Sequence, residues 1–331
     1  MKYRTLGQGL EVSAIGIGCM TMVATKNIVY GEPVSEDDAI AVVHEAIERG
    51  VTFFDTAQIY GPFTNEEFVG RAIRGKRDKL VIATKFGFRF GPKGIEGTDS
   101  SPANIRKVCE ESLARLGTDR IDLFYQHRVD PNTPIEDVVG TLAELKAEGK
   151  IAHIGLSEAG EQTLRRAHAV HPITALQSEY SLWERGVEDG ILPACEELGI
   201  GFVPYSPLGR GFLTGMITSR DDIPEDDWRR NDPRWSEENF GANMAIVDAI
   251  KQIADGKGAS PAQIALAWLL TRGEHVVPIP GVKRMATMRD SVAAAELELT
   301  PDDLAALDKA VPSGAAQGDR YPERGMRMVR L

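Results

Sequence analysis

The sequence has few of the features that mark a secreted protein. It contains three cysteines in 331 residues, Cys19, Cys109 and Cys195, which are far apart and form no CxxC pair. An odd number of isolated cysteines predicts neither a disulfide framework nor a zinc cluster, and favours a reducing compartment. The first ten residues, MKYRTLGQGL, lack the long apolar segment of a signal peptide. We therefore expect a cytoplasmic protein.

Long hydrophobic runs and an excess of positive charge are also missing. No run of about 18 apolar residues occurs, so no membrane-spanning helix is predicted. Lys and Arg number 38 against 49 Asp and Glu, which gives a formal net charge of −11. That balance argues against a duplex nucleic acid or an anionic membrane as the main partner, although a local basic pocket for a small anion stays compatible with it.

What the chain does contain is a repeated alternation of short apolar runs with stretches of helical periodicity. Apolar residues make up 42% of the sequence, which is enough for a large core. The predicted strands cover residues 14–18, 52–55, 80–84, 121–125, 151–156, 175–177, 201–204 and 276–278. The predicted helices cover residues 36–49, 65–74, 102–116, 135–148, 161–170, 187–198, 243–254 and 285–295. Local signals agree, such as Ser101-Pro102 as a cap with a first-turn proline, and Gly117 as a stop.

This alternation predicts an α/β fold. Strands that alternate with helices pair in parallel through right-handed crossovers, and eight such units predict a closed (β/α)8 TIM barrel. The alternative is an open doubly wound sheet, which usually carries GxGxxG after its first strand. Here Gly16-Ile17-Gly18 is followed by Cys19-Met20-Thr21, so that fingerprint fails.

Several segments are additions to the eight units. Residues 2–6 and 11–12 predict an N-terminal β-hairpin that caps the barrel bottom, and residues 261–271 and 301–310 predict two extra helices. A long, polar, Pro-rich loop (206–240) follows strand seven, and a tail (312–331) ends the chain. Loops of this length in compact domains are usually functional or disordered. We expect a single domain over residues 1–331.

Four polar side chains follow neighbouring predicted strands. Asp55 and Tyr60 follow the second strand, Lys85 the third and His127 the fourth. Each has an ordinary explanation alone, such as a solvated rim lysine or a loop histidine. Active sites of such barrels lie at the carboxyl ends of the strands, so all four converge on one mouth. An ammonium held by a carboxylate lowers the pKa of a phenol, and a histidine donates to an oxygen, so the set is able to protonate an oxygen that gains charge.

The sequence resembles the aldo-keto reductases over nearly its full length. The motifs that carry the resemblance are GIGCM (16–20), DTAQIYG (55–61), ATKFG (83–87), RLGTDRIDLFYQHRVDP (115–131), GKIAHIGLSE (149–158), LQSEYSLWER (176–185), YSPLGRGFLTG (205–215) and PIPGVKR (278–284). The resemblance implies hydride transfer from NADPH to the carbonyl of a small-molecule aldehyde or ketone. It implies Tyr60 as general acid, Lys85 paired with Asp55 to lower the pKa of Tyr60, and His127 to orient the carbonyl.

The resemblance also assigns a cofactor site. Ser157 and Gln177 match the residues that hold the nicotinamide carboxamide, and Tyr205 matches the aromatic residue that stacks on the nicotinamide. The pyrophosphate is matched by Ser206, Leu208, Gly209 and Gly211, and the adenosine phosphate by Gly281, Lys283 and Arg284. Thr287, Asp290 and Ser291 fall on the adenine side, and loop 206–240 covers the cofactor, with the tail near the active-site mouth. Glycine-rich turns and cations near a helix N-terminus suit phosphates. The alternative for Lys283 and Arg284 is that they are ordinary solvated charges on the surface.

The chain departs from the family at some of these positions, and two other functions stay open. Glu158 stands where many relatives have Asn, and the changes at Thr287 and Ser291 leave the preference for NADPH over NADH open. The alternative function is a nucleotide-binding, redox-sensing regulatory subunit with little turnover. A metal-dependent hydrolase is a distant third, since HAVH (168–171) lacks a third ligand nearby and no metal is expected.

The substrate and the oligomeric state are not predicted. Candidate pocket residues are Met22, Val23, Tyr30, Arg128, Trp183, Arg320 and Tyr321. Arg128 either binds an acidic substrate or pairs with Asp130, and the pairing is the favoured prediction.

Overall fold

Seven parallel strands form the main sheet. The computed structural model describes residues 1–22, 33–92 and 94–331. The strands follow the order β3 (Ile17–Gly18), β4 (Phe53–Asp55), β5 (Val81–Phe86), β8 (Ile121–Gln126), β9 (Ile151–Ser157), β10 (Ala175–Glu179) and β11 (Gly201–Tyr205). Neighbours in this order pair in parallel throughout. The predicted strands at these seven places are therefore confirmed.

The eighth predicted strand closes the sheet into a barrel as a run of isolated bridges. Backbone hydrogen bonds of 2.8 to 3.1 Å join residues 275–279 to β11. On the other side, Gly16 N donates to Pro278 O and Gly18 N donates to Pro280 O, each at 3.0 Å. Pro278 and Pro280 have no N–H, so neither of them donates a hydrogen bond back across this seam. The barrel is thus closed, with its weakest ladder at the seam.

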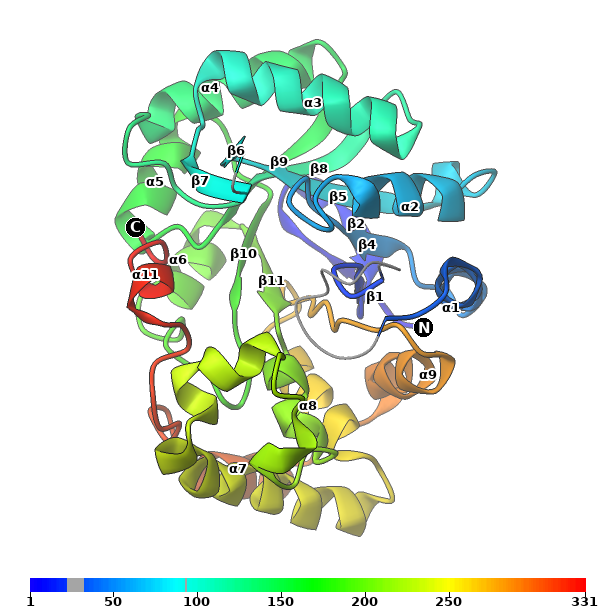
Figure 1. The fold of residues 1–331 in the computed structure, drawn as a ribbon, viewed down its shortest axis with the longest axis vertical. Helices are drawn as coiled ribbons and strands as arrows, with labels where there is room; N and C mark the ends of the chain where they lie inside the picture. The colour runs from blue at the N-terminus through cyan, green and yellow to red at the C-terminus, as the bar shows by residue number, and fades with distance from the viewer. Residues whose placement is uncertain (23–32, 93) are drawn as a thin grey trace.

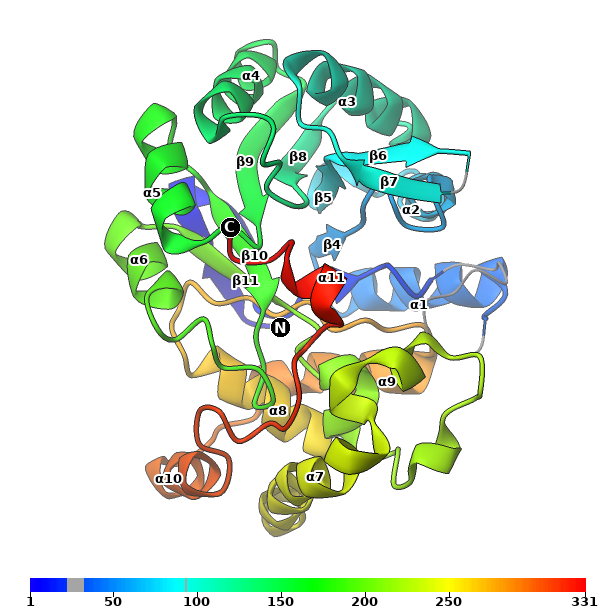
Figure 2. The ribbon, with the colours of Figure 1, turned by 60° about the vertical axis from the view of Figure 1, so that its left-hand side comes forward.

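Helices surround the strands on the outside of the barrel, as Figures 1 and 2 show. In chain order they are α1 (Glu36–Glu48), α2 (Thr64–Ala72), α3 (Pro102–Leu116), α4 (Ile135–Ala147), α5 (Glu161–Val170), α6 (Ile191–Leu198), α7 (Glu237–Lys257), α8 (Pro261–Leu270), α9 (Met285–Ala293), α10 (Pro301–Ala310) and α11 (Glu323–Met326). The predicted signals are present in α3, because the Ser101 side chain accepts from Asn104 N and Gly117 ends the helix in a left-handed conformation. The two extra helices are α8 and α10, as predicted.

The N-terminal hairpin closes the bottom of the barrel. Strands β1 (Tyr3–Thr5) and β2 (Glu11–Ser13) pair antiparallel. Leu6, Leu10 and Val12 from this hairpin share one buried core with strand residues inside the barrel, among them Phe53 and Tyr125. The interior is therefore filled with side chains at this end, and a ligand has access only from the opposite end.

Several segments differ from the prediction, among them α11, which was not predicted, and α6, which begins at Ile191 rather than at residue 187. An antiparallel hairpin, β6 (Phe88–Gly91) with β7 (Gly94–Thr98), follows β5 and was not predicted. Helix α7 begins at Glu237, earlier than predicted, because the Ser236 side chain caps it by accepting from Asn239 N at 3.3 Å. In the described ranges no helix is both long and apolar enough to cross a membrane.

The long loop after β11 is ordered by four short 3-10 turns, namely Gly209–Thr214, Arg220–Asp222, Trp228–Asn231 and Pro233–Trp235. Trp235 is fully buried, and Phe212 stacks on Trp183 with ring centroids 4.1 Å apart. Each large buried aromatic side chain removes a wide apolar surface from water. The loop is therefore anchored to the main hydrophobic core, which holds its position beside the barrel mouth.

Candidate active site

The four predicted catalytic residues lie together at the carboxyl ends of adjacent strands. Asp55 ends β4 and pairs in register with Ala83 of β5, two residues before Lys85. His127 directly follows β8, and Tyr60 lies in the turn after β4. Because these strands are neighbours in a parallel sheet, three separate segments deliver their polar side chains to one place.

Lys85 is the centre of the group. Its side chain is fully buried, and Nζ donates to Asp55 Oδ1, to Thr56 O at 2.9 Å and to Tyr60 OH at 3.3 Å. The three donors of the ammonium are thus all used. The second oxygen of Asp55 accepts from Gln177 Nε2 at 2.8 Å, so Gln177 also positions the carboxylate.

The charges of this group follow from burial and pairing. Burial acts to lower the pKa of Lys85, but Asp55 and Tyr60 outweigh it, so the pKa is raised and the ammonium stays charged. Burial raises the pKa of Tyr60, and although Lys85 opposes this effect, the pKa is raised overall. The expected lowering by Lys85 is therefore present but smaller than the effect of desolvation. Tyr60 keeps its proton at neutral pH.

His127 is buried beside Tyr60. The two rings meet edge to face with centroids 6.0 Å apart, and Phe88 contacts the other side of the imidazole at 5.0 Å. Burial, together with the positive charges of Arg128 and Lys85, holds the pKa of His127 well below its usual range. The imidazole is neutral, so it carries one N–H to donate to a ligand oxygen.

Tyr60 and His127 face a cavity of about 400 Å³ at the barrel mouth. A volume of this order suits a small organic ligand. The apolar part of its wall comes from Met20, Ile59, Pro62, Phe88, Ile95 and Trp228. Four predicted cofactor residues, Ser157, Gln177, Tyr205 and Ser206, line the same cavity, and so does Gly281.

The predicted pyrophosphate turn lies next to this cavity. Gly209 and Gly211 have positive φ angles of 56° and 98°, a backbone conformation that side chains disfavour. A Cβ added at Gly209 would lie 2.6 Å from the Trp183 ring, so only glycine fits there. Leu208 precedes the turn and is partly buried against the main hydrophobic core. These residues keep the backbone close to the mouth.

The predicted adenine side lies at the start of α9. Arg284 is the exposed residue before the helix, and Thr287 Oγ1 donates to its carbonyl at 2.9 Å. Asp290 instead accepts from Ser260 Oγ at 2.8 Å and from Gln263 Nε2 at 2.9 Å, so it ties α8 to α9. Ser291 is buried, and Lys283 is partly buried. Adenine and phosphate contacts by these residues stay predictions.

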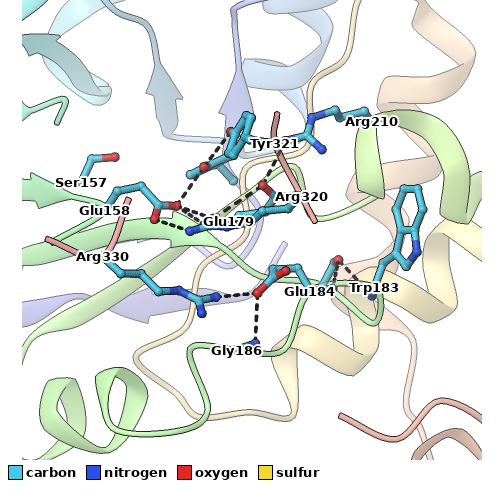
Figure 3. A network of polar contacts seen from close by, with 12 residues as sticks. Ser157, Glu158, Glu179, Trp183, Glu184, Gly186, Arg210, Arg320, Tyr321 and Arg330 are labelled. Atoms are coloured by element: carbon cyan, nitrogen blue, oxygen red, sulfur yellow. Dashed lines mark hydrogen bonds and ion pairs between the residues drawn. The ribbon is translucent and has the colours of Figure 1, made fainter. Parts of the chain in front are cut away.

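Glu158, the departure from the family pattern, is fully buried and holds the C-terminal tail (Figure 3). Its carboxylate accepts from both terminal nitrogens of Arg320 at 2.7 and 2.6 Å, from Tyr205 OH at 2.8 Å and from Glu179 N at 3.0 Å. Burial alone would raise the pKa of Glu158, but Arg320 outweighs it and lowers the pKa to about 2. Both oxygens are thus committed to contacts within the protein.

The tail contributes to the cavity wall through Tyr321. Its hydroxyl lies 2.9 Å from that of Tyr205, and its ring lines the cavity. Farther along, Arg330 Nη2 contacts Glu184 Oε1 at 2.5 Å, and Arg330 N donates to Glu158 O at 2.7 Å, as Figure 3 shows for the Glu184 pair. These contacts attach both ends of the segment 320–330 to the barrel.

Some predictions about the pocket are corrected. Arg128 does not pair with Asp130, because that carboxylate accepts from Thr98, Ser100 and nearby loop residues instead. Met22 and Trp183 are buried in the core, and neither lines the cavity. Val23 and Tyr30 lie outside the described residues.

Arg210 is a site residue that the sequence reasoning missed. It lines the cavity, bonds to Glu179 at 3.0 Å and to Asp232 at 3.1 Å, and lies 4.8 Å from the ring centroid of Tyr321. The only local signal is its place between two glycines in GRGFLTG. Its two carboxylate partners are distant in sequence, so the residues around Arg210 do not indicate them.

Comparison with known proteins shows the family and supports the fold. The model of the Aldo/keto reductase family matches residues 14–312. A probable aldo-keto reductase 1 from Glycine max is 47% identical over 318 residues, which cover 95% of this chain and 90% of the relative. The chain belongs to the aldo/keto reductase family, and so to a family of oxidoreductases.

Solved structures of other proteins share this fold. A glycerol dehydrogenase from Gluconobacter oxydans superimposes with a TM-score of 0.86 at 30% identity, with 97% of this chain and 98% of that chain covered. An aldo/keto reductase from Klebsiella pneumoniae, solved in complex with NADP and acetate, gives a TM-score of 0.74 at 27% identity, covering 97% and 99%. The (β/α)8 barrel predicted from the sequence is confirmed by the structure and by these neighbours.

Proposed function

We propose that the protein is an NADPH-dependent reductase that converts aldehyde or ketone carbonyls to alcohols. The observation that carries the proposal is the position of Lys85 Nζ, which contacts both Asp55 and the Tyr60 hydroxyl at the edge of a cavity shared with His127. A protonated phenol beside a fixed ammonium is a proton donor whose conjugate base is stabilised by the neighbouring charge.

The chain has groups that suit a reduced nicotinamide dinucleotide. Tyr205 offers an aromatic ring in the cavity wall, and Ser157 offers a hydroxyl beside it. The glycine turn at Gly209 brings backbone close to the mouth, and the N-terminus of α9 with Lys283 and Arg284 suits a phosphate. The NADP-bound Klebsiella pneumoniae relative supports this choice of cofactor. When bound, the cofactor supplies the hydride.

The protein's own residues orient the carbonyl and supply the proton. His127, neutral and buried, donates its N–H to the substrate carbonyl oxygen and fixes the orientation of the carbonyl. Tyr60 gives its proton to the same oxygen as negative charge grows there, and Lys85 stabilises the resulting phenolate. Asp55, held by Gln177, keeps Lys85 charged and in place. The packed loop after β11 and the attached tail keep bulk water away from the reacting atoms.

The experiment compares wild type with Tyr60→Phe, using NADPH consumption with a panel of aldehydes and ketones and NADPH binding by cofactor fluorescence. We expect reduction by wild type, loss of at least about 100-fold in kcat in the variant, and an unchanged Kd for NADPH. An equal rate in the variant would exclude Tyr60 as the acid. NADPH binding without reduction of any carbonyl by wild type would instead favour the regulatory-subunit alternative.

A further inference from the structure

Arg128 is a cation that faces the reaction cavity and has unused hydrogen-bond donors. It follows His127 in the chain, and both residues line the cavity with Tyr60. Arg128 Nη1 donates to His127 O at 2.7 Å and to Ser157 Oγ at 3.3 Å. In the described part of the chain, Nε and Nη2 have no hydrogen-bond partner. Neither nitrogen atom is completely buried. This edge of the guanidinium is therefore open to the cavity.

The carboxylates near Arg128 are already committed to other groups. Asp130 accepts from Thr98 and Ser100 N, and within residues 1–22, 33–92 and 94–331 no carboxylate oxygen lies within 4.0 Å of the Arg128 nitrogens. Glu158 influences Arg128 electrostatically, but both of its oxygens bind Arg320. Among the described residues, the site thus supplies no direct counter-ion to this guanidinium.

Arg210 also lies in the cavity wall, but unlike Arg128 it is paired with carboxylates. It forms ion pairs with Glu179 at 3.0 Å and with Asp232 at 3.1 Å. Within the residues that the structure describes, two carboxylates therefore pair with Arg210 and none pairs with Arg128. Arg128 has the His127 carbonyl, the Ser157 hydroxyl and, at 6.0 Å, the Tyr205 ring beside it, and its Nε and Nη2 stay available to an anionic ligand.

The chemistry of the open edge identifies the ligand. The Nε and Nη2 atoms of arginine present two parallel N–H groups, which match the two oxygens of a carboxylate. One such edge with a single positive charge suits a monoanionic carboxylate better than a phosphate dianion. The apolar wall of Phe88, Ile95 and Trp228 suits the hydrocarbon part of the same molecule.

We propose that Arg128 binds a carboxylate of the substrate, and that the protein reduces carbonyl compounds carrying a carboxylate, such as aromatic 2-oxo acids or formyl acids. This inference rests on the proposed function, and it names the substrate class of that site. The carboxylate itself does not react: the carbonyl carbon receives the hydride from NADPH, which becomes NADP⁺, and the carbonyl oxygen receives the proton of Tyr60.

The test compares each acid with its own methyl ester, which keeps the carbonyl and removes the charge. The pairs are phenylglyoxylate with methyl phenylglyoxylate, and 4-carboxybenzaldehyde with methyl 4-formylbenzoate. For at least one pair we expect wild type to favour the acid by about 100-fold in kcat/KM, which is the size of one charge-assisted contact. The variant Arg128→Leu should bring that ratio close to one. Arg128→Lys should give an intermediate ratio, because lysine keeps the positive charge but lacks the two parallel N–H groups.

Arg89→Leu is the matched control, because Arg89 is exposed on β6 and does not line the cavity, so its loss should leave the acid-to-ester ratio unchanged. Wild-type ratios near one for both pairs, or an unaltered ratio in Arg128→Leu, would overturn the proposal while leaving the reductase function intact.

A binding measurement separates this failure from failure of the proposed function. Calorimetric titration with phenylacetate and phenylacetamide, in the presence of NADP⁺, reports the anion site without turnover. Tighter binding of phenylacetate that disappears in Arg128→Leu supports the site even if no carbonyl is reduced. Equal binding of the two compounds to wild type, together with acid-to-ester ratios near one, would exclude a carboxylate site at Arg128.

Discussion

Arg320 and Glu158, which are 162 positions apart in the chain, form a two-point ion pair inside the protein with N–O distances of 2.7 and 2.6 Å. The exposed fractions of the two side chains are 2% and 0%. Glu158 also accepts from Tyr205, the residue predicted to stack on the nicotinamide, so the tail and the predicted cofactor site share one carboxylate. The attachment of the tail and the shape of the site are therefore one structural feature.

Removing one partner of this pair should destabilise the fold. Arg320→Met leaves the buried carboxylate of Glu158 without its counter-ion, and we expect a loss of about 3–5 kcal/mol in the free energy of unfolding, measured by urea denaturation. The double variant Glu158→Gln with Arg320→Met should recover part of that loss. As a control, Arg327→Met breaks an exposed pair with Glu323 and should change stability little. A loss in Arg320→Met no larger than in the control would contradict the ion-pair account.

The same pair predicts an acid-sensitive component of stability. The pKa of Glu158 is lowered in the folded protein to about 2, below the usual carboxyl value in the unfolded chain. Its contribution is therefore complete above about pH 5 and disappears as the pH falls toward 2. The difference in unfolding free energy between wild type and Glu158→Gln should shrink by about 3 kcal/mol over this window. A difference that does not depend on pH would show that Glu158 is not ionised in the fold.

The pH dependence of reduction should be flat through neutral pH. Tyr60 keeps its proton because burial raises its pKa, and His127 stays neutral because burial lowers its pKa. Neither group changes protonation between about pH 6 and pH 9 in the free protein, so kcat/KM for reduction should vary little there. Alcohol oxidation needs the phenolate and should rise with pH instead. An inflection in the reduction profile near pH 6.5 would indicate a titrating His127.

The cofactor preference should depend on the cations before α9. If Lys283 and Arg284 hold the adenosine phosphate, the double variant Lys283→Ala with Arg284→Ala should raise the Kd for NADPH by about 10- to 100-fold. Its Kd for NADH should stay the same, because NADH lacks that phosphate. Fluorescence titration with both nucleotides measures each value. A parallel weakening of both nucleotides would place these residues in a general structural role.

The order of the elements and the members of the predicted catalytic group can be read from the amino-acid sequence. Helix caps such as Ser101 and Ser260 act on backbone groups only a few residues away, so they are visible in a short window of sequence. The eight apolar runs indicate buried parallel strands, and the barrel rule then places Asp55, Lys85 and His127 at one mouth. The proximity of these three side chains followed without any knowledge of side-chain contacts.

The contacts between distant segments become visible only in the folded protein. The Glu158–Arg320 pair, the two carboxylates on Arg210 and the contacts of Arg128 with His127 O and Ser157 depend on where loops and tail pack, and no periodicity records such contacts. The prediction that Arg128 pairs with Asp130 failed because nearness in sequence was used in place of geometry, and Asp130 was already satisfied by Thr98 and Ser100. Local hydrogen bonds thus shape the elements and can be read from the chain, whereas the charge balance of the cavity arises only when the whole chain has packed.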